Sequence, residues 1–253
     1  MHPLAQRDLL RGRTAVVTGG SSGIGAATVA ALAAEGARVV IGYNQGSDRA
    51  EALRASLPGD GHRIARVSLD DPATHAALAD LLGRDDGQID VLVNCAGYTT
   101  RIPHGDLDAL DGTLFNEVLL VNAGGTYSVV RALLPLMRRS GNAAVVSVSS
   151  VAAFTGSGSN IAYCAAKAAV DTMTLSLARA FGPEVRFLCV SPASVDTDFV
   201  PGRSREDVRK KAASTPLGRA VTPEDVALAV VGCITHLRTA TGTRIVIDGG
   251  FTL

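Results

Sequence analysis

The 253-residue sequence has no tryptophan, few aromatic residues and no net charge. Lys plus Arg and Asp plus Glu each number 24, which argues against a large surface for nucleic acid or anionic membrane. The four cysteines lie far apart without a Cys-x-x-Cys pair, so the sequence indicates neither a metal site nor a disulfide framework. Aromatic residues make up 4% of the chain and hydrophobic residues 47%, so the core must consist mainly of Ala, Val, Leu and Ile.

Long hydrophobic runs are also missing. Residues 1–13 contain charges and lack the apolar stretch of a secretory signal. Residues 140–166 are uncharged, but they are rich in Ser, Gly and Asn, which disfavours a membrane span. We therefore expect a soluble, cytoplasmic protein that binds neither membrane nor nucleic acid.

Short apolar runs alternate with helical segments along the chain. The predicted strands are residues 14–18, 37–43, 63–69, 89–93, 144–148, 185–190 and 244–247. The predicted helices are residues 24–35, 47–57, 72–82, 108–120, 123–140, 161–181 and 223–237. This alternation predicts one α/β domain over residues 1–253, with a doubly wound, parallel seven-stranded sheet of the Rossmann type.

Residues 199–216 interrupt this alternation. They carry several charged residues around Pro201 and end at Pro216. The composition favours a helical insertion that forms a lid over the carboxyl ends of the strands. A solvated surface helix is the alternative.

A glycine-rich turn follows the first predicted strand. Gly19, Gly23 and Gly25 permit a tight turn, close approach of a ligand and close packing of the next helix. The free N–H groups at the start of that helix suit a pyrophosphate. The Gly-x-x-x-Gly-x-Gly spacing departs from Gly-x-Gly-x-x-Gly, and a turn without a ligand is the alternative.

The end of the second predicted strand bears on cofactor choice. An acidic residue there would hydrogen-bond the ribose of NAD, but the sequence has Tyr43 and Asn44, and no carboxylate before Asp48. Arg49 lies close by. These residues favour NADP over NAD, although Ser22 stands where an arginine would strengthen that choice.

Tyr163 and Lys167 are four residues apart in a predicted helix and so share one face. A lysine ammonium near a tyrosine hydroxyl lowers the tyrosine pKa from about 10, which would make Tyr163 an acid or base near neutral pH. The alternative is an incidental pair on a surface helix.

Taken together, these motifs resemble the classical short-chain dehydrogenase/reductase family over nearly the whole chain, with most likeness to 3-oxoacyl-[acyl-carrier-protein] reductases. The matching segments are Thr18 to Gly25, Asn94-Cys95-Ala96-Gly97, Asn122, Ser150 at 13 residues before Tyr163, Tyr163 to Lys167, and Asp248-Gly249-Gly250. Three departures are Ser191-Pro192-Ala193 in place of Pro-Gly, Ser68-Leu69 in place of an aspartate at the adenine, and Tyr43 in place of the NAD-selecting acid.

The resemblance implies a role for each matched residue. Tyr163 would exchange the proton of the carbonyl oxygen, and Ser150 would hydrogen-bond that oxygen. Lys167 would hold the nicotinamide ribose, and Asn122 would position a water beside Lys167. The expected cofactor contacts are Gly19, Ser21, Ser22, Gly23, Ile24, Gly25, Tyr43, Asn44, Ser68, Leu69, Asn94, Ala96, Gly97, Tyr163, Lys167, Pro192, Val195 and Thr197.

The function that follows is an NAD(P)-dependent ketoreductase or alcohol dehydrogenase acting on a small molecule by hydride transfer. Two alternatives stay open, a 3-oxoacyl-[acyl-carrier-protein] reductase proper and a non-catalytic dinucleotide sensor or scaffold. The resemblance also implies a homotetramer.

Overall fold

The computed structural model describes residues 8–253; residues 1–7 of the predicted domain lie outside the described part. Seven strands form one parallel sheet in the order β3-β2-β1-β4-β5-β6-β7, which confirms the predicted doubly wound fold. The strands are β1 (Thr14–Thr18), β2 (Arg38–Tyr43), β3 (Arg63–Arg66), β4 (Val91–Asn94), β5 (Ala143–Val148), β6 (Val185–Pro192) and β7 (Thr243–Ile247).

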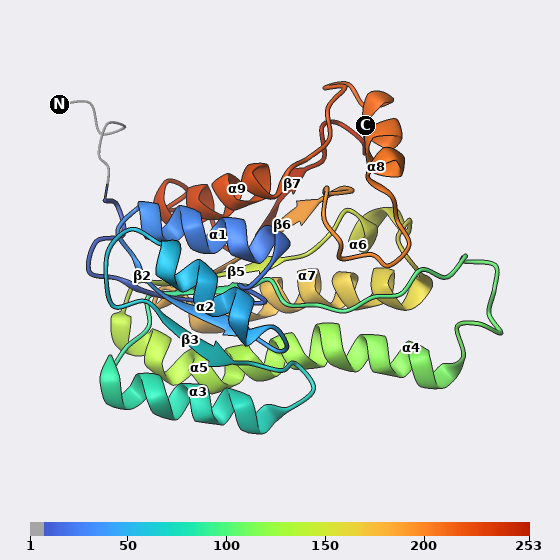
Figure 1. Cartoon of the computed structure of the whole chain (residues 1–253). Coiled ribbons are helices and arrows are strands. Elements are labelled where there is room, and N and C mark those ends of the chain that lie inside the picture. Colours follow the sequence, from blue (N-terminus) through green and yellow to red (C-terminus); the bar gives the residue numbers. More distant parts are fainter. Residues whose placement is uncertain (1–7) are drawn as a thin grey trace.

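Helices cover both faces of the sheet (Figure 1). They are α1 (Gly23–Ala34), α2 (Ser47–Ser56), α3 (Pro72–Asp85), α4 (Gly112–Leu119), the π-helical turn η2 (Leu120–Gly125), α5 (Thr126–Ser140), α6 (Ala152–Thr155), α7 (Ile161–Phe181), α8 (Arg205–Ala213) and α9 (Pro223–Thr235). Helices α1 and α9 lie together on one face, and α3, α5 and α7 lie on the other.

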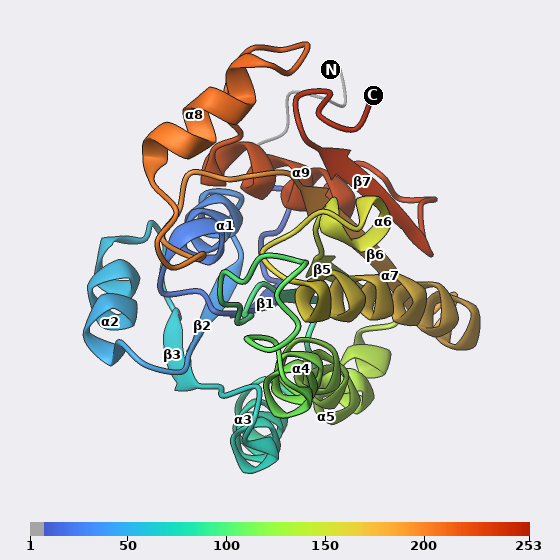
Figure 2. The ribbon, with the colours of Figure 1, turned by 90° about the vertical axis from the view of Figure 1, so that its right-hand side faces the viewer.

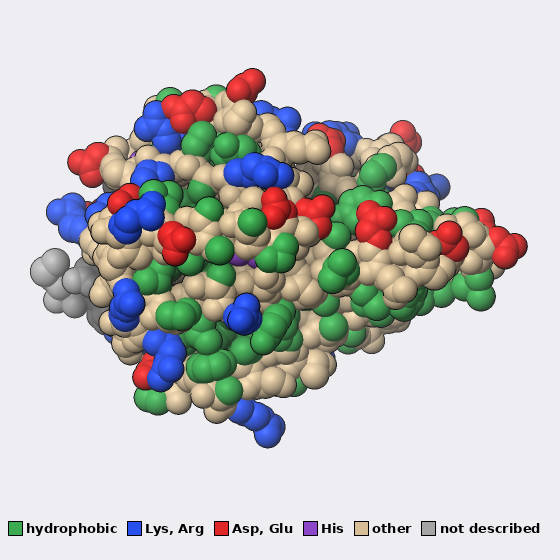
Figure 3. Space-filling view, turned by 90° about the horizontal axis from the view of Figure 1, so that it is seen from below, with side chains coloured by type: hydrophobic (Ala, Val, Ile, Leu, Met, Phe, Trp, Pro, Cys, Tyr) green, Lys and Arg blue, Asp and Glu red, His purple; other side chains and the backbone are tan. Residues whose placement is uncertain are grey.

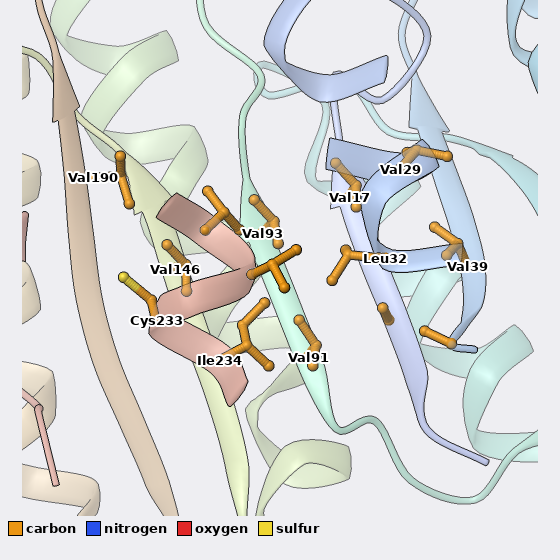
Figure 4. Packing of buried hydrophobic residues seen from close by; sticks show 14 of the residues in the cluster. Val17, Val29, Leu32, Val39, Val91, Val93, Val146, Val190, Cys233 and Ile234 are labelled. Atoms are coloured by element: carbon orange, nitrogen blue, oxygen red, sulfur yellow. The ribbon is translucent and has the colours of Figure 1, made fainter. Parts of the chain in front are cut away.

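The core consists mainly of aliphatic side chains, as the scarcity of aromatic residues predicts. Val17, Val93 and Val146, on three neighbouring strands, point toward α1 and α9, where Leu32 and Ile234 meet them (Figure 4). All five side chains are buried. Each such side chain contributes about 1.5–3 kcal/mol through its removal from water.

The structure corrects the predicted break near Ala123. Helices α4 and α5 are one continuous helical segment, which passes through η2 instead of ending. A Cβ on Gly125 would lie 2.5 Å from the carbonyl oxygen of Leu69, so this glycine permits close packing and does not end the helix. The predicted gap between residues 120 and 123 is therefore wrong, because the helical segment continues through η2.

The third strand is shorter than predicted and ends at Arg66. The N–H of Val67 still donates to the carbonyl of Tyr43, but the N–H of Ser68 donates to the hydroxyl of Thr74. The chain thus leaves the sheet and turns toward α3 before Leu69.

By length and composition alone, the segment Gly112–Ser140 could cross a membrane. Its residues Val118, Val129, Leu133 and Met137 are buried within the protein. Helix α5 packs on α3, and α4 packs on α7, as expected for a core helix of a globular domain.

Three cysteines are buried, while Cys95 is only partly so, and none of the four forms a disulfide. Within residues 8–253 no cluster of His, Cys, Asp and Glu could hold a metal ion. In Figure 2 the carboxyl ends of the strands point toward the viewer, and α1, α6 and α8 lie around them.

Candidate active site

A cleft of about 1630 Å³ lies at the carboxyl ends of the central strands. Its walls come from the turn after β1, the segments after β4, β5 and β6, the first turns of α7, and α8. This is where the strand order reverses between β1 and β4, the usual ligand position in doubly wound folds. The volume exceeds the roughly 300–1,000 Å³ of a pocket for one drug-sized ligand.

The glycine turn between β1 and α1 is closely packed. Gly19 and Gly23 have φ of +64° and +51°, in the left-handed region that favours glycine. A Cβ on Gly25 would lie 2.1 Å from the carbonyl oxygen of Gly19, and a Cβ on Gly19 would lie 2.8 Å from the Cα of Ala96. The backbone of the turn therefore packs too closely for side chains at Gly19 and Gly25, both of which line the cleft.

Helix α1 begins in this turn with its first N–H groups uncapped by a side chain. Ser22, at the N-cap, has extended backbone and forms no side-chain capping bond, and the first turn has no acidic residue. An anionic group would satisfy these donors and the positive end of the helix dipole. These features fit the pyrophosphate of a dinucleotide.

Thr18 ties this turn to the next strand. Its buried hydroxyl oxygen accepts hydrogen bonds from the N–H groups of Cys95 and Ala96, at 3.1 and 3.2 Å. Asn94 is also buried and donates to the hydroxyl of Ser147, so it holds β4 to β5 from behind the cleft wall.

Tyr163 projects into the cleft from the first turn of α7. Asn160, completely buried, caps this helix by accepting the N–H of Tyr163 at 2.7 Å. Its amide also donates to the carbonyl of Thr100 at 2.8 Å. Asn160 thus fixes Tyr163 relative to the loop on the opposite wall.

Lys167 lies one turn beyond Tyr163 on the same helix face. Its Nζ is 5.6 Å from the centre of the Tyr163 ring and donates to the carbonyl of Val148 at 2.8 Å. The side chain is buried, and burial lowers its pKa. Ser150, just after β5, lines the same part of the cleft and hydrogen-bonds the Tyr163 side chain.

The expectation of a lowered Tyr163 pKa is wrong for this structure. Burial raises the pKa of Tyr163 above its usual value, and this outweighs the hydrogen bond with Ser150 and the positive charge of Arg203, which both lower it. The Lys167 ammonium donates one of its hydrogens to the Val148 carbonyl. The hydroxyl is therefore protonated at neutral pH.

Asn122 lies in the π-helical turn η2 and is buried. Its side-chain oxygen accepts the N–H of Tyr98, and its amide donates to the carbonyls of Tyr98 and Val118, at 2.8 to 3.0 Å. The amide therefore holds the loop after β4. That Asn122 positions a water for Lys167 stays a prediction.

Most of the predicted cofactor contacts line the cleft. They are Gly19, Ser21, Ser22, Gly23, Ile24, Gly25, Asn44, Leu69, Ala96, Gly97, Tyr163, Lys167, Pro192, Val195 and Thr197. Tyr43, Ser68 and Asn94 do not line it. Tyr43 packs against the core instead, and Ser68 is buried between α3 and the strands, where its hydroxyl donates to Asp70.

The comparisons with known proteins agree with this geometry. A family profile described as enoyl-(acyl carrier protein) reductase matches residues 19–252. The chain is 39% identical over 241 residues to the Streptomyces violaceoruber protein assigned as ketoacyl reductase 2 of the granaticin polyketide synthase, covering 93% of this chain and 94% of that one. The chain belongs to the short-chain dehydrogenase/reductase family.

Two further relatives extend the range of chemistry. The chain is 35% identical over 251 residues to a D-threitol dehydrogenase of Mycolicibacterium smegmatis, covering 96% and 94% of the two chains. A gluconate 5-dehydrogenase of Burkholderia cenocepacia, solved with NADP and tartrate, superposes with a TM-score of 0.87 at 25% identity, covering 97% of each chain. Like its relatives, this short-chain dehydrogenase/reductase is an NAD(P)-dependent oxidoreductase of ketones and alcohols, and a non-catalytic scaffold is set aside.

Sequence reasoning missed several residues of the site. Asn160 and Arg203 gain their positions from contacts with distant loops, so no local motif marks them. Asp70 lines the cleft two residues after the expected Ser68. Phe199, expected as part of the segment 199–216 beside the pocket, places its ring centre 6.0 Å from that of Tyr163, a pairing that the sequence did not predict.

Proposed function

We propose that this protein interconverts a small-molecule ketone and its secondary alcohol, with Tyr163 exchanging the proton and NADP as the preferred cofactor. The observation that carries the proposal is the convergence of Tyr163, Ser150 and Lys167 on one wall of a cleft that begins at the glycine turn. A panel of ketones and alcohols, followed at the absorbance of the reduced nicotinamide, tests it. Turnover of no member would contradict it.

When bound, the nicotinamide supplies or accepts the hydride. Ser150 donates a hydrogen bond to the carbonyl oxygen and so orients it toward Tyr163. Tyr163 donates its proton as that oxygen gains negative charge, or accepts one in the reverse direction. Lys167, held by the Val148 carbonyl, keeps its remaining hydrogens for the ribose hydroxyls.

The preference for NADP rests on the cleft wall after β2. Asn44, Gln45 and Arg49 line it, and no carboxylate stands there at the position that would accept a ribose hydroxyl. The guanidinium of Arg49 lies against Gly46, because a Cβ added to this glycine would be 2.5 Å from one of its nitrogens. Its charge is suited to a 2′-phosphate.

Replacing Arg49 tests this preference. A charge-assisted hydrogen bond contributes about 1.5–3 kcal/mol, so Arg49→Gln should weaken NADPH binding roughly 10- to 150-fold and leave NADH binding unchanged. Arg54→Gln, on the same helix but paired with Glu51, is the matched control and should change neither. Tighter binding of NADH by the unmodified protein would contradict the preference.

Acyl-carrier-protein substrates remain the second candidate function. The family profile's description and the granaticin relative favour it. The Arg138–Glu184 pair, at 2.7 Å, does not line the cleft and does not bear on this candidate, whereas Lys210 and Lys211 of α8 line it and would suit an acidic carrier. Comparing the same 3-oxoacyl group on a carrier protein and on a small thiol tests it, because a carrier substrate predicts a large preference for the former.

We also propose that residues 199–216 close over the bound substrate. Helix α8 borders the cleft and buries only Val208 and Ala212, so few contacts hold it to the rest of the protein.

We further propose that the chain forms a homotetramer. Hydrophobic side chains spread over the lower face of the molecule, which α4 and α5 help to form, and Leu120 of η2 and Tyr127 of α5 are exposed (Figure 3). Light scattering should give four times the chain mass; a monomer would contradict the assembly.

A further inference from the structure

Arg203 stands beside the reacting end of the cleft. It lies between β6 and α8, and one of its terminal nitrogens donates to the carbonyl of Val195 at 2.8 Å. This bond orients the guanidinium, which lines the same cleft as Tyr163 and acts on Tyr163 through its charge. Its position therefore places a cation close to the group that exchanges the proton.

The donors of Arg203 are incompletely satisfied. Its Nε is buried and has no hydrogen-bond partner, and within residues 8–253 no carboxylate lies within ion-pair distance of the guanidinium. The two carboxylates whose charge reaches it are committed elsewhere. Asp196 pairs with Arg205 at 2.9 Å, and Asp207 belongs to the capping box of α8. A partly buried cation without an anion is costly, so the site is suited to receive one.

A second cation faces the same space from the opposite wall. Arg101, in the loop after β4, lines the cleft and donates to the carbonyl of Gly202 at 3.4 Å. Its charge acts on Arg203 unfavourably. Arg101 likewise forms no ion pair with any residue from 8 to 253. Two arginines that repel each other across a cleft would both be stabilised by one shared anion.

We propose that Arg203, assisted by Arg101, binds the carboxylate of a hydroxy acid or oxo acid substrate beside Tyr163. This assignment rests on the proposed function and narrows its substrate class. The planar guanidinium matches a carboxylate through two parallel hydrogen bonds. The cofactor's phosphates are the less suitable occupant, because the uncapped N–H groups that fit them lie at the start of α1, whereas Arg203 acts on Tyr163.

Calorimetric titration of the protein saturated with oxidised cofactor tests the site without turnover. The probes are 4-oxocyclohexanecarboxylate and 3-oxobutanoate, each compared with its primary amide. The acids should bind at least tenfold more tightly than the amides. Arg203→Gln should weaken acid binding at least tenfold and amide binding less than threefold, and Arg101→Gln should have a smaller effect of the same sign. Arg209→Gln, on the outer side of α8 and not in the cleft wall, should change neither.

Equal binding of acid and amide, absence of acid binding, or an equal effect of Arg203→Gln on both would overturn the proposal. Loss of cofactor affinity in Arg203→Gln with unchanged acid preference would also overturn it and would assign Arg203 to the cofactor. Failure of the proposed function looks different. In that case the protein fails to bind either nicotinamide cofactor, or turns over no ketone or alcohol of any charge.

Discussion

Thr18 offers a sharp test of how the cofactor wall is built. Its hydroxyl is completely buried at the end of β1 and accepts the N–H groups of Cys95 and Ala96. Thr18→Val keeps the shape of the side chain but removes the acceptor, so two backbone donors lose their partner. An unsatisfied buried donor costs about 1–3 kcal/mol. Cys95 and Ala96 are only partly buried, so each N–H should cost about 1–2 kcal/mol. The expected loss is about 2–4 kcal/mol of the free energy of unfolding.

Thr28→Val is the matched control for this substitution. Thr28 is also completely buried, but its hydroxyl donates to the carbonyl of Ile24, which keeps its helical hydrogen bond in the variant. Thr28→Val should therefore cost less than about 1 kcal/mol. Urea denaturation measures both losses. Because Ala96 lines the cleft, Thr18→Val should also weaken cofactor binding at least tenfold. Equal stability of the two variants, with cofactor affinity retained in both, would refute the reasoning.

Three further variants probe the site. Ser150→Ala removes the hydrogen bond that lowers the pKa of Tyr163, so the rise of alcohol oxidation with pH should move to higher pH; an unchanged profile of kcat/KM would count against this role. Gly25→Ala forces a Cβ to 2.1 Å from the carbonyl oxygen of Gly19 and should weaken cofactor binding at least tenfold by fluorescence titration; normal affinity would disprove the close packing. Asn160→Ala removes the cap that accepts the N–H of Tyr163, so it should cost about 0.5–2 kcal/mol of the free energy of unfolding. It should also lower kcat by a larger factor than it changes KM, because Tyr163 loses its fixed position. An unaltered kcat would show that the cap has no part in catalysis.

Local patterns predicted most of the fold because they reflect local physics. The first strand and helix α7 match their predicted bounds, since a short apolar run that ends in glycines and a long segment of helical periodicity leave few alternatives. Where tertiary contacts override local signals, prediction failed. The predicted gap between residues 120 and 123 does not exist, because the helical segment continues through η2, where Gly125 packs closely against Leu69.

In the candidate site, too, local motifs were predicted from the sequence and features that depend on tertiary contacts were not. The glycine turn and the Tyr163–Lys167 pair are local motifs, and the structure brings both to the cleft. The raised pKa of Tyr163 depends on burial by distant segments, which the spacing of Tyr163 and Lys167 could not reveal. Arg203 acquires its place only when the segment after β6 folds back to Val195.

Replacement of Tyr163 by phenylalanine tests the central claim most directly. The substitution removes one hydroxyl and leaves the ring that packs near Phe199. With the ketone or alcohol that the protein turns over fastest, kcat should fall by about 10²–10⁴-fold, the usual contribution of a positioned acid or base. Titration of the same variant should give a cofactor dissociation constant within about threefold of the unmodified protein, because only one hydroxyl is lost and the glycine turn and Lys167, which line the same cleft, remain. Undiminished turnover by Tyr163→Phe would contradict the assignment of Tyr163 as the group that exchanges the proton.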